Sequence, residues 1–260
     1  MLYTLFPVVL ILIVIFFYKK PKRRNTEPFP KQWRGLLKDH VKFYNNLPRK
    51  KQPVFERRMM QFLGEVYIEG VDTELTDLDK ILIASSAVIP VFGFAEWHYT
   101  NLSGILLYPD YFNDDLEFAD TAGSRNIGGL VGTGRFEKQM ILSRRALYHG
   151  FENTTDKTNT GIHEFVHLID KMDGSTDGIP EHLLEHKYAV PWLNLMHREM
   201  EAINDDKSDI RKYGGTNQAE FFAVAAEYFF ERPDLFEDKH PELFKMMQLC
   251  FYPVQQQDSK

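Results

Sequence analysis

Cysteine is almost absent from this sequence of 260 residues, in which Cys250 is the single example. One thiol cannot form an internal disulfide, and such scarcity is typical of proteins that fold in a reducing compartment. Excess positive charge is also lacking, because 37 acidic residues outnumber 31 basic ones and give a net charge of −6. A chain with this charge has no general attraction for nucleic acid, so we expect no nucleic-acid partner.

The beginning of the chain lacks charge altogether. Residues 2–18 read LYTLFPVVLILIVIFFY, and a basic block follows at once, made of Lys19, Lys20, Lys22, Arg23 and Arg24. As a helix this run would span about 26 Å, at ~1.5 Å per residue, which is at the short end of what crosses a bilayer. The alternative is a buried core helix, but a run that is apolar on all sides and flanked by a basic block argues against it.

The order of these features favours a retained anchor over a cleaved signal peptide. A signal peptide carries its positive charge before the apolar run and small residues after it, whereas here the charge follows and no such cleavage site is found. Because basic residues remain on the cytoplasmic side, we expect a single-pass protein of the cell (inner) membrane whose domain faces the cytoplasm.

The remainder of the chain shows mainly helical periodicity. Glycine-rich residues 123–134 lack the Gly-Lys-Ser/Thr ending of a phosphate loop, so we expect a loop beside a cleft. The predicted fold class is α+β, a mainly helical domain with a small β-sheet, preceded by the transmembrane helix. Helices are predicted over 31–46, 54–68, 78–88, 159–172, 191–204, 217–230 and 233–251, and strands over 104–108 and 139–143.

One predicted helix carries the sequence His163-Glu164-Phe165-Val166-His167. Histidines four residues apart project from the same face of a helix and can bind one metal ion. Glu164 lies next to the first histidine, where it can take a proton from a water whose pKa zinc lowers to about 7. The alternative is that the two histidines only pack into the core or face solvent, although a chance match to this motif is expected in about one per cent of such chains.

A catalytic zinc ion requires a third protein ligand, and the sequence offers several acids. Asp173 stands where metzincins have their third histidine, but Asp170 replaces the glycine of that pattern, and Glu185 fits neither usual spacing of thermolysin-like enzymes. Glu220 and Glu227 lie seven residues apart on an almost entirely apolar predicted helix, for which Thr216 is the expected N-cap. Acids on such a helix are costly to bury unless they are paired or bound to metal. The alternative is that both face solvent.

Two longer segments resemble the Mlc titration factor A family of zinc metallopeptidases. These segments are HEFVHLIDKMDG and KYGGTNQAEFFAVAAEYFF, and the resemblance extends to AVIPVFGFAEWHYTNLSGILLYPDYF and KQMILS. It covers residues 30–253, which is most of the chain. The family members are gluzincins whose active site is similar to that of anthrax lethal factor.

This resemblance implies a role for each matching residue. His163, His167 and Glu220 would be the Zn²⁺ ligands, Glu164 the general base, and Tyr213 a donor to the transition state, although a loop tyrosine that only packs its ring remains the alternative. It also implies an aminopeptidase-like activity on a peptide or protein substrate, but no residue identifies an amine-binding pocket.

The domain boundaries follow from these assignments. We predict a transmembrane anchor over 1–18, a basic linker over 19–30, a zinc metallopeptidase domain over 31–255 and a tail over 256–260. The namesake of the family is a soluble protein that binds the glucose repressor Mlc, and nothing in this sequence identifies a repressor-binding surface. A regulator-binding module with a zinc site is therefore the alternative function, with a regulatory protein as partner. Asp170 and Asp173 are expected to hold the second nitrogen of a ligand histidine.

Overall fold

The computed structural model describes residues 27–113, 127–132, 137–153 and 155–252, and within them the chain is mostly helical with a small mixed sheet. The helices are α2 (Trp33–His40), α3 (Lys42–Asn46), α4 (Gln52–Glu65), α5 (Asp77–Val88), α6 (Arg144–Glu152), α7 (Thr160–Asp170), α8 (Ala189–Asn204), α9 (Gln218–Glu231), α10 (Pro233–Lys239) and α11 (Pro241–Phe251). Short 3₁₀ turns lie at η2 (Lys171–Asp173), η3 (His186–Tyr188) and η4 (Lys212–Gly215).

The sheet contains β1 (Tyr67–Gly70), β2 (Gly104–Tyr108), β3 (Gly129–Val131) and β4 (Gln139–Ser143) in the order β1-β2-β4-β3. β1 is parallel to β2 and β2 is parallel to β4, whereas β3 is antiparallel to β4. Among the described residues, β3 therefore forms one edge of the sheet and is paired with a strand on one side only.

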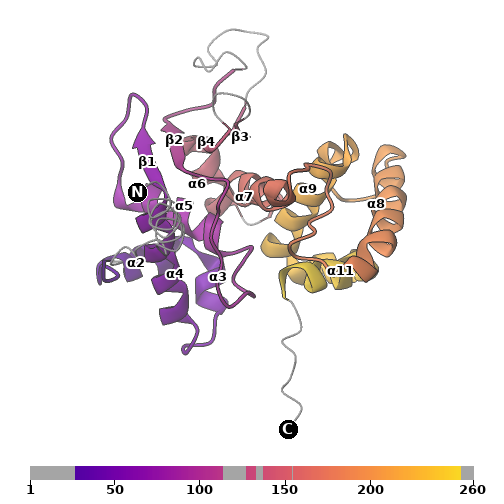
Figure 1. Ribbon diagram of the computed structural model, residues 1–260, viewed down its shortest axis with the longest axis horizontal. Helices are drawn as coiled ribbons and strands as arrows, with labels where there is room; N and C mark the ends of the chain where they lie inside the picture. The colour runs from indigo at the N-terminus through magenta and orange to yellow at the C-terminus, as the bar shows by residue number, and fades with distance from the viewer. Residues whose placement is uncertain (1–26, 114–126, 133–136, 154, 253–260) are drawn as a thin grey trace, which may run out of the picture.

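Helices α7 and α9 lie side by side in the middle of the molecule (Figure 1). The sheet and α2 to α6 lie on one side of this pair, and α8 and α11 lie on the other. α7 also packs against α5, β3 and β4. Its position is fixed by an aromatic contact on its inner face, where the ring of Phe165 lies 5.5 Å from Phe62 and 5.2 Å from Tyr99, centroid to centroid.

The apolar stripe of α7 explains why it is buried here. Ile162, Phe165, Val166 and Ile169 are all almost completely buried. These positions recur at the helical spacing of three and four residues, so one face of α7 enters the core while the histidines occupy another. α7 ends at Asp170 and continues into the 3₁₀ turn η2, which ends where Gly174, with φ at +99°, adopts the left-handed conformation that glycine allows.

The prediction of a membrane-spanning helix is contradicted. Among the described residues, no helix is long and apolar enough to cross a bilayer. The apolar α9, for example, has 14 residues, including three glutamates, and is about 21 Å long, against the ~30 Å of a hydrocarbon core. The predicted fold class is therefore wrong in its transmembrane helix, and so is the predicted single-pass localisation. Residues 2–18 themselves lie outside the described residues.

Several predicted elements are confirmed with nearly the predicted bounds, and two predicted helices are each interrupted and form two shorter helices. The strands over 104–108 and 139–143 are confirmed as β2 and β4, and the helix over 78–88 is confirmed as α5, which begins with a capping box between Thr76 and Asp79. The helix predicted over 31–46 is interrupted at Val41. The helix predicted over 233–251 is interrupted at His240, which separates α10 from α11.

Candidate metal centre

The first turn of α7 is fixed by its cap, and this turn carries the first histidine. Asn159 is the N-cap, and its Oδ1 accepts a hydrogen bond from the backbone N–H of Ile162 at 3.0 Å. His163 and His167 follow one turn apart, the first almost buried and the second half-buried. Their imidazoles meet edge to face, with Nε2 of His167 3.0 Å from Nε2 of His163.

Helix α9 brings an acid to the same place. Asn217, rather than the predicted Thr216, is its N-cap and accepts a hydrogen bond from the backbone N–H of Glu220 at 2.9 Å. The backbone of Glu220 is thereby held in the first turn of α9, which packs along α7. The residues that follow it are almost all buried, so α9 is the apolar helix that the sequence predicted.

Three side chains converge on one point between the two helices. Oε2 of Glu220 lies 3.1 Å from Nε2 of His163 and 3.4 Å from Nε2 of His167. One donor atom from each of the three residues lies within 4.8 Å of the other two. The sequence left the third acid open on spacing alone, and the structure brings Glu220 to the two imidazoles.

The other candidate acids lie elsewhere. The side chain of Glu185 is 71% exposed and pairs with Lys187. Asp173 accepts a hydrogen bond from the backbone N–H of Ser175, and Asp170 accepts one from that of Gly178. At His163, the second ring nitrogen is held by Glu227 rather than by either aspartate.

Glu227 is 1% exposed and lies directly behind His163. Its Oε1 is 2.7 Å from Nδ1 of His163, the ring nitrogen that faces away from Glu220. It also accepts hydrogen bonds from the guanidinium of Arg211 and, at 2.5 Å, from the backbone N–H of Asn159. Sequence reasoning identified Glu227 as a buried acid, but it missed Arg211 and Asn159, which carry no motif.

Glu164 is almost buried and faces the edge strand of the sheet. The backbone of Gly129 in β3 lies so close that a Cβ at this position would be 2.7 Å from Oε1 of Glu164. Beyond the strand, Nζ of Lys171 donates to the carbonyl of Gly132 at 3.1 Å and ties the end of α7 to this segment. β3 lies within the region that the sequence assigned to a glycine-rich loop, so part of that loop is a strand beside the site.

Tyr213 lies in η4, next to the histidines. Its ring is stacked on that of His163, with the centroids 6.1 Å apart and the planes at 28°. The side chain is also accessible, because the residue is 38% exposed. The structure thus places Tyr213 at the border between the buried donors and solvent, which both interpretations of this residue allow.

The charges of the site shift one another's pKa values. Burial opposes protonation of His163, but Glu227 and Glu220 outweigh it and raise the pKa of His163 to about 10. Burial likewise opposes ionisation of Glu220, but hydrogen bonds from His163 and His167 hold its pKa well below the usual range. The pKa of Glu164 is raised, chiefly by burial. The surrounding acids therefore favour positive charge between the two helices, which a metal cation would supply.

The donor chemistry fits a divalent metal ion. Two imidazoles and one carboxylate form the protein part of many catalytic metal sites, in which a further position is left to water. Ligand histidines typically donate their second N–H to a carboxylate, as His163 can to Glu227. His163, His167 and Glu220 are the residues that would hold such an ion.

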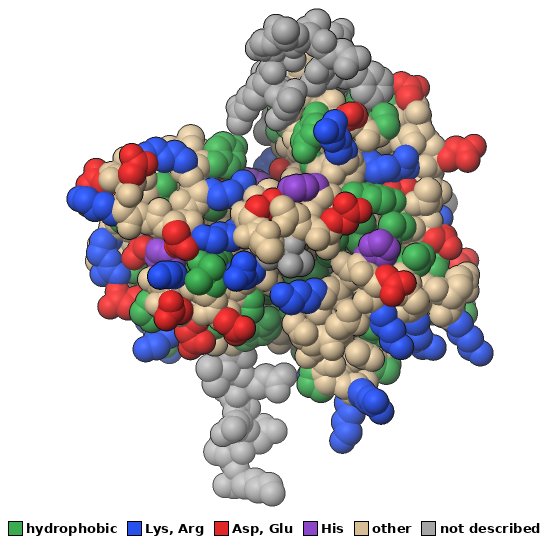
Figure 2. Space-filling model, turned by 180° about the vertical axis from the view of Figure 1, so that it is seen from behind, with side chains coloured by type: hydrophobic (Ala, Val, Ile, Leu, Met, Phe, Trp, Pro, Cys, Tyr) green, Lys and Arg blue, Asp and Glu red, His purple; other side chains and the backbone are tan. Residues whose placement is uncertain are grey.

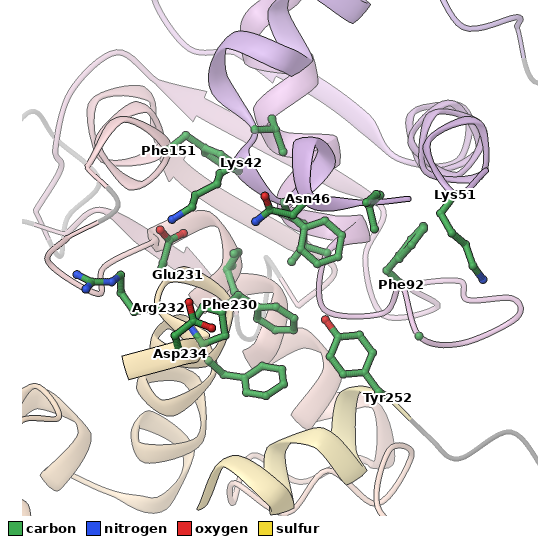
Figure 3. A pocket seen from close by; sticks show the side chains of 18 of the residues that line it. Lys42, Asn46, Lys51, Phe92, Phe151, Phe230, Glu231, Arg232, Asp234 and Tyr252 are labelled. Atoms are coloured by element: carbon green, nitrogen blue, oxygen red, sulfur yellow. The ribbon is translucent and has the colours of Figure 1, made fainter. Parts of the chain in front are cut away.

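A separate cavity of about 610 Å³ lies beyond the C-terminal end of α9 (Figure 3). Its walls combine aromatic rings with charged side chains, and the labelled Lys42, Glu231, Arg232 and Tyr252 all line it. None of the three candidate metal ligands lines this cavity. It is thus distinct from the metal centre, although Glu231 at its wall accepts a hydrogen bond from Nδ2 of Asn159.

Comparison with known proteins gives a consistent result. The family model described as glucose-regulated metallo-peptidase M90 matches residues 17–252. Mlc titration factor A of Cronobacter sakazakii is 31% identical, over 83% of this chain and 83% of that protein. Mlc titration factor A of Pectobacterium atrosepticum is 28% identical, over 71% and 70% of the two chains. An uncharacterized protein of Synechocystis sp. is 28% identical, over 90% and 89%.

Proposed function

Because the chain belongs to the glucose-regulated metallo-peptidase M90 family, we propose that it is a zinc-dependent peptidase that hydrolyses peptide bonds. The observation that carries this proposal is the convergence of His163, His167 and Glu220, with Glu164 beside them. Zinc is the metal that best suits two imidazoles and a carboxylate in a hydrolytic site.

In the proposed mechanism, the metal ion and the protein side chains have separate roles. When bound, zinc supplies a Lewis acid that activates water and polarises the substrate carbonyl. Glu164 takes the proton of the attacking water and passes it to the leaving amine, for which a carboxylate held beside the metal ligands is well placed. The hydroxyl of Tyr213 donates a hydrogen bond to the oxyanion that develops on the carbonyl oxygen.

The edge strand β3 supports a peptide as the substrate. Its side away from β4 pairs with no strand in the described part of the chain, and it can hydrogen-bond to an extended peptide, as sheet edges do in many peptide complexes. Gly129 in this strand contacts Glu164, so a peptide along β3 would lie next to the general base. β4 is paired on both sides, whereas β3 has the open edge of the sheet as far as the described residues show it.

A peptide-hydrolysis assay tests this proposal directly. The full-length protein is incubated with a mixture of short peptides, with added zinc and again with a chelator, and the products are identified by mass spectrometry. We expect cleavage that the chelator abolishes and that zinc restores. Peptides with a free and a blocked N-terminus separate an aminopeptidase from an endopeptidase. Zinc binding without cleavage of any peptide in the mixture would contradict the enzymatic function.

Binding of a regulatory protein is the second candidate function. It is favoured by the relatives named Mlc titration factor A, of which the Cronobacter protein aligns over 83% of this chain. The face shown in Figure 2 carries basic and acidic side chains interspersed, with hydrophobic side chains between them. The intact Glu164 favours catalysis, because a metal site that serves only stability does not require a base. A pull-down with a purified repressor, in the presence of zinc and of chelator, tests the second candidate.

A further inference from the structure

Glu227 connects three parts of the metal centre. It accepts hydrogen bonds from Nδ1 of His163 in α7, from the backbone of Asn159 at the cap of α7, and from Arg211 directly before η4. Glu227 itself belongs to α9, which also carries Glu220. Both oxygens of this buried carboxylate are thus engaged with groups that surround the candidate ligands.

The hydrogen bond to His163 decides which ring nitrogen can bind a metal. An ionised carboxylate only accepts hydrogen bonds, so the proton of a neutral His163 belongs on Nδ1, at 2.7 Å from Oε1 of Glu227. The lone pair is then on Nε2, the nitrogen that lies 3.1 Å from Glu220. Without Glu227 the ring could carry its proton on either nitrogen, and only one of the two forms offers Nε2 to a metal.

Arg211 links Glu227 to the segment that carries Tyr213. Its guanidinium donates to the same Oε1 that faces His163, and two residues later Tyr213 stacks on the His163 ring. The ion pair between Arg211 and the buried Glu227 therefore anchors the short segment from which Tyr213 reaches the site. Loss of one partner would leave the charge of the other uncompensated inside the protein.

We infer that Glu227 is a positioning residue of the metal centre: it directs Nε2 of His163 toward the metal position and, through Arg211, holds Tyr213 beside that ring. This inference rests on the proposed metal site but not on its catalytic activity. The alternative is that Glu227 only joins α7 to α9 as a buried structural ion pair. That alternative predicts a loss of stability without a specific change at His163.

Glu231 provides a matched control for Glu227. It lies one turn further along α9, its carboxylate is also largely withdrawn from solvent, and it accepts a hydrogen bond from Nδ2 of the same Asn159 at 3.0 Å. Its side chain lines the cavity of Figure 3, which His163 does not line. Substitution of either glutamate removes a carboxyl group from the same helix, but only Glu227 bonds to the ring of His163.

The experiment compares these variants without reference to turnover. Zinc affinity is measured by competition with a chromophoric chelator, and the tautomer of His163 is read from the ¹⁵N shifts of the zinc-loaded protein. We expect Glu227→Gln to lower zinc affinity by about 10- to 100-fold, the usual effect of losing such a partner, and to reduce the population protonated at Nδ1. Glu231→Gln should change neither measurement by more than about twofold, as expected away from the ligands.

Each outcome decides between the two interpretations. Equal zinc affinities for the wild-type protein and Glu227→Gln, with an unchanged His163 tautomer, would overturn the inference. If Glu227→Gln does not fold, Arg211→Met and Arg211→Lys replace it. Arg211→Met should lower zinc affinity in the same competition assay, and Arg211→Lys should restore part of the loss; identical affinities of the two variants would overturn the inference. Failure of the wild-type protein to bind zinc would instead contradict the proposed function.

Discussion

Gly129 in the edge strand and Glu164 in the histidine helix are in direct contact. A Cβ at position 129 would lie 2.5 Å from Cγ of Glu164 and 2.7 Å from its Oε1, closer than carbon atoms approach in folded proteins. The strand backbone therefore forms the wall against which the carboxylate of Glu164 rests. Any side chain at position 129 must displace either this carboxylate or the strand.

Gly129→Ala is expected to impair catalysis while sparing metal binding. The added methyl group would move the carboxylate of Glu164, and a displacement of this size at a reacting group typically costs about 100-fold in rate. The measurements are kcat and zinc content. Gly104→Ala is the control, because in β2 the added Cβ would meet its nearest atom at 3.6 Å. Equal kcat values for the two variants would show that the contact has no role.

Glu164→Gln should keep the metal and lose turnover. Glutamine has nearly the same shape but cannot take a proton, so kcat should fall by about 100-fold or more. Zinc content by atomic absorption should match that of the wild-type protein. Glu185→Gln, at an exposed acid outside the site, should leave both values unchanged. Undiminished turnover in Glu164→Gln would remove this residue from the mechanism.

Glu220→Ala should weaken zinc binding far more than Glu227→Ala. Glu220 is a candidate ligand, with its oxygen 3.1 Å from Nε2 of His163, whereas Glu227 faces the other nitrogen of that ring. Loss of the ligand should lower affinity by more than about 100-fold, beyond the range of a residue that only orients a ligand. Chelator competition measures both variants. The reverse order of affinities would make Glu227 the metal ligand.

Tyr213→Phe should lower kcat by about 10- to 100-fold, because the variant retains the ring but loses the hydroxyl that donates to the oxyanion. The ring contact with His163, at 6.1 Å between centroids, is preserved, so zinc content should not change. Steady-state kinetics separate the two interpretations of this residue. A change confined to KM would assign Tyr213 to substrate binding, and no change would leave it as a packing residue.

The stability of the protein should depend on pH through Glu231. Burial raises the pKa of Glu231 to about 7, above the value of 4.5 for a free glutamate. Between these two pH values the folded state binds more protons than the unfolded state, so the free energy of unfolding falls as pH rises, by at most about 1.4 kcal/mol per pH unit for one group. Urea unfolding between pH 4.5 and 7.5 should show a flatter profile for Glu231→Gln. Parallel profiles would contradict this assignment.

The histidine helix could be predicted from the sequence because its signals are local. The apolar positions 162, 165, 166 and 169 and the closing Gly174 all lie within one segment, which folds as α7 and the short turn η2. Strands β2 and β4 were equally clear, because both are short apolar runs near turns. The motif identified His163 and His167 as candidate ligands, whereas the choice of Glu220 over Glu227 came from the family resemblance and not from the spacing of the residues.

Other parts of the site depend on contacts that are distant in sequence. β3 has only three residues and begins with Gly129, so its composition indicated a loop. It is a strand because it pairs with β4. The partners of Glu227 lie 16 residues away, at Arg211, and 68 residues away, at Asn159. Neither of them belongs to a recognisable motif. Position along the chain gave no sign that they meet, and only the packing of α7 on α9 brings them together.

Because the candidate ligands are divided between α7 and α9, binding of the proposed metal would depend on the folded packing of these two helices. His163 and Glu220 are 57 positions apart in the sequence, so an unfolded chain offers no ready coordination sphere. A metal ion that binds the folded protein but not the unfolded chain raises the free energy of unfolding, and this increase grows with the logarithm of the ion's concentration. Loss of the proposed metal would consequently favour proteolysis of this protein as well as loss of the proposed activity, so that its abundance and its activity would decline together.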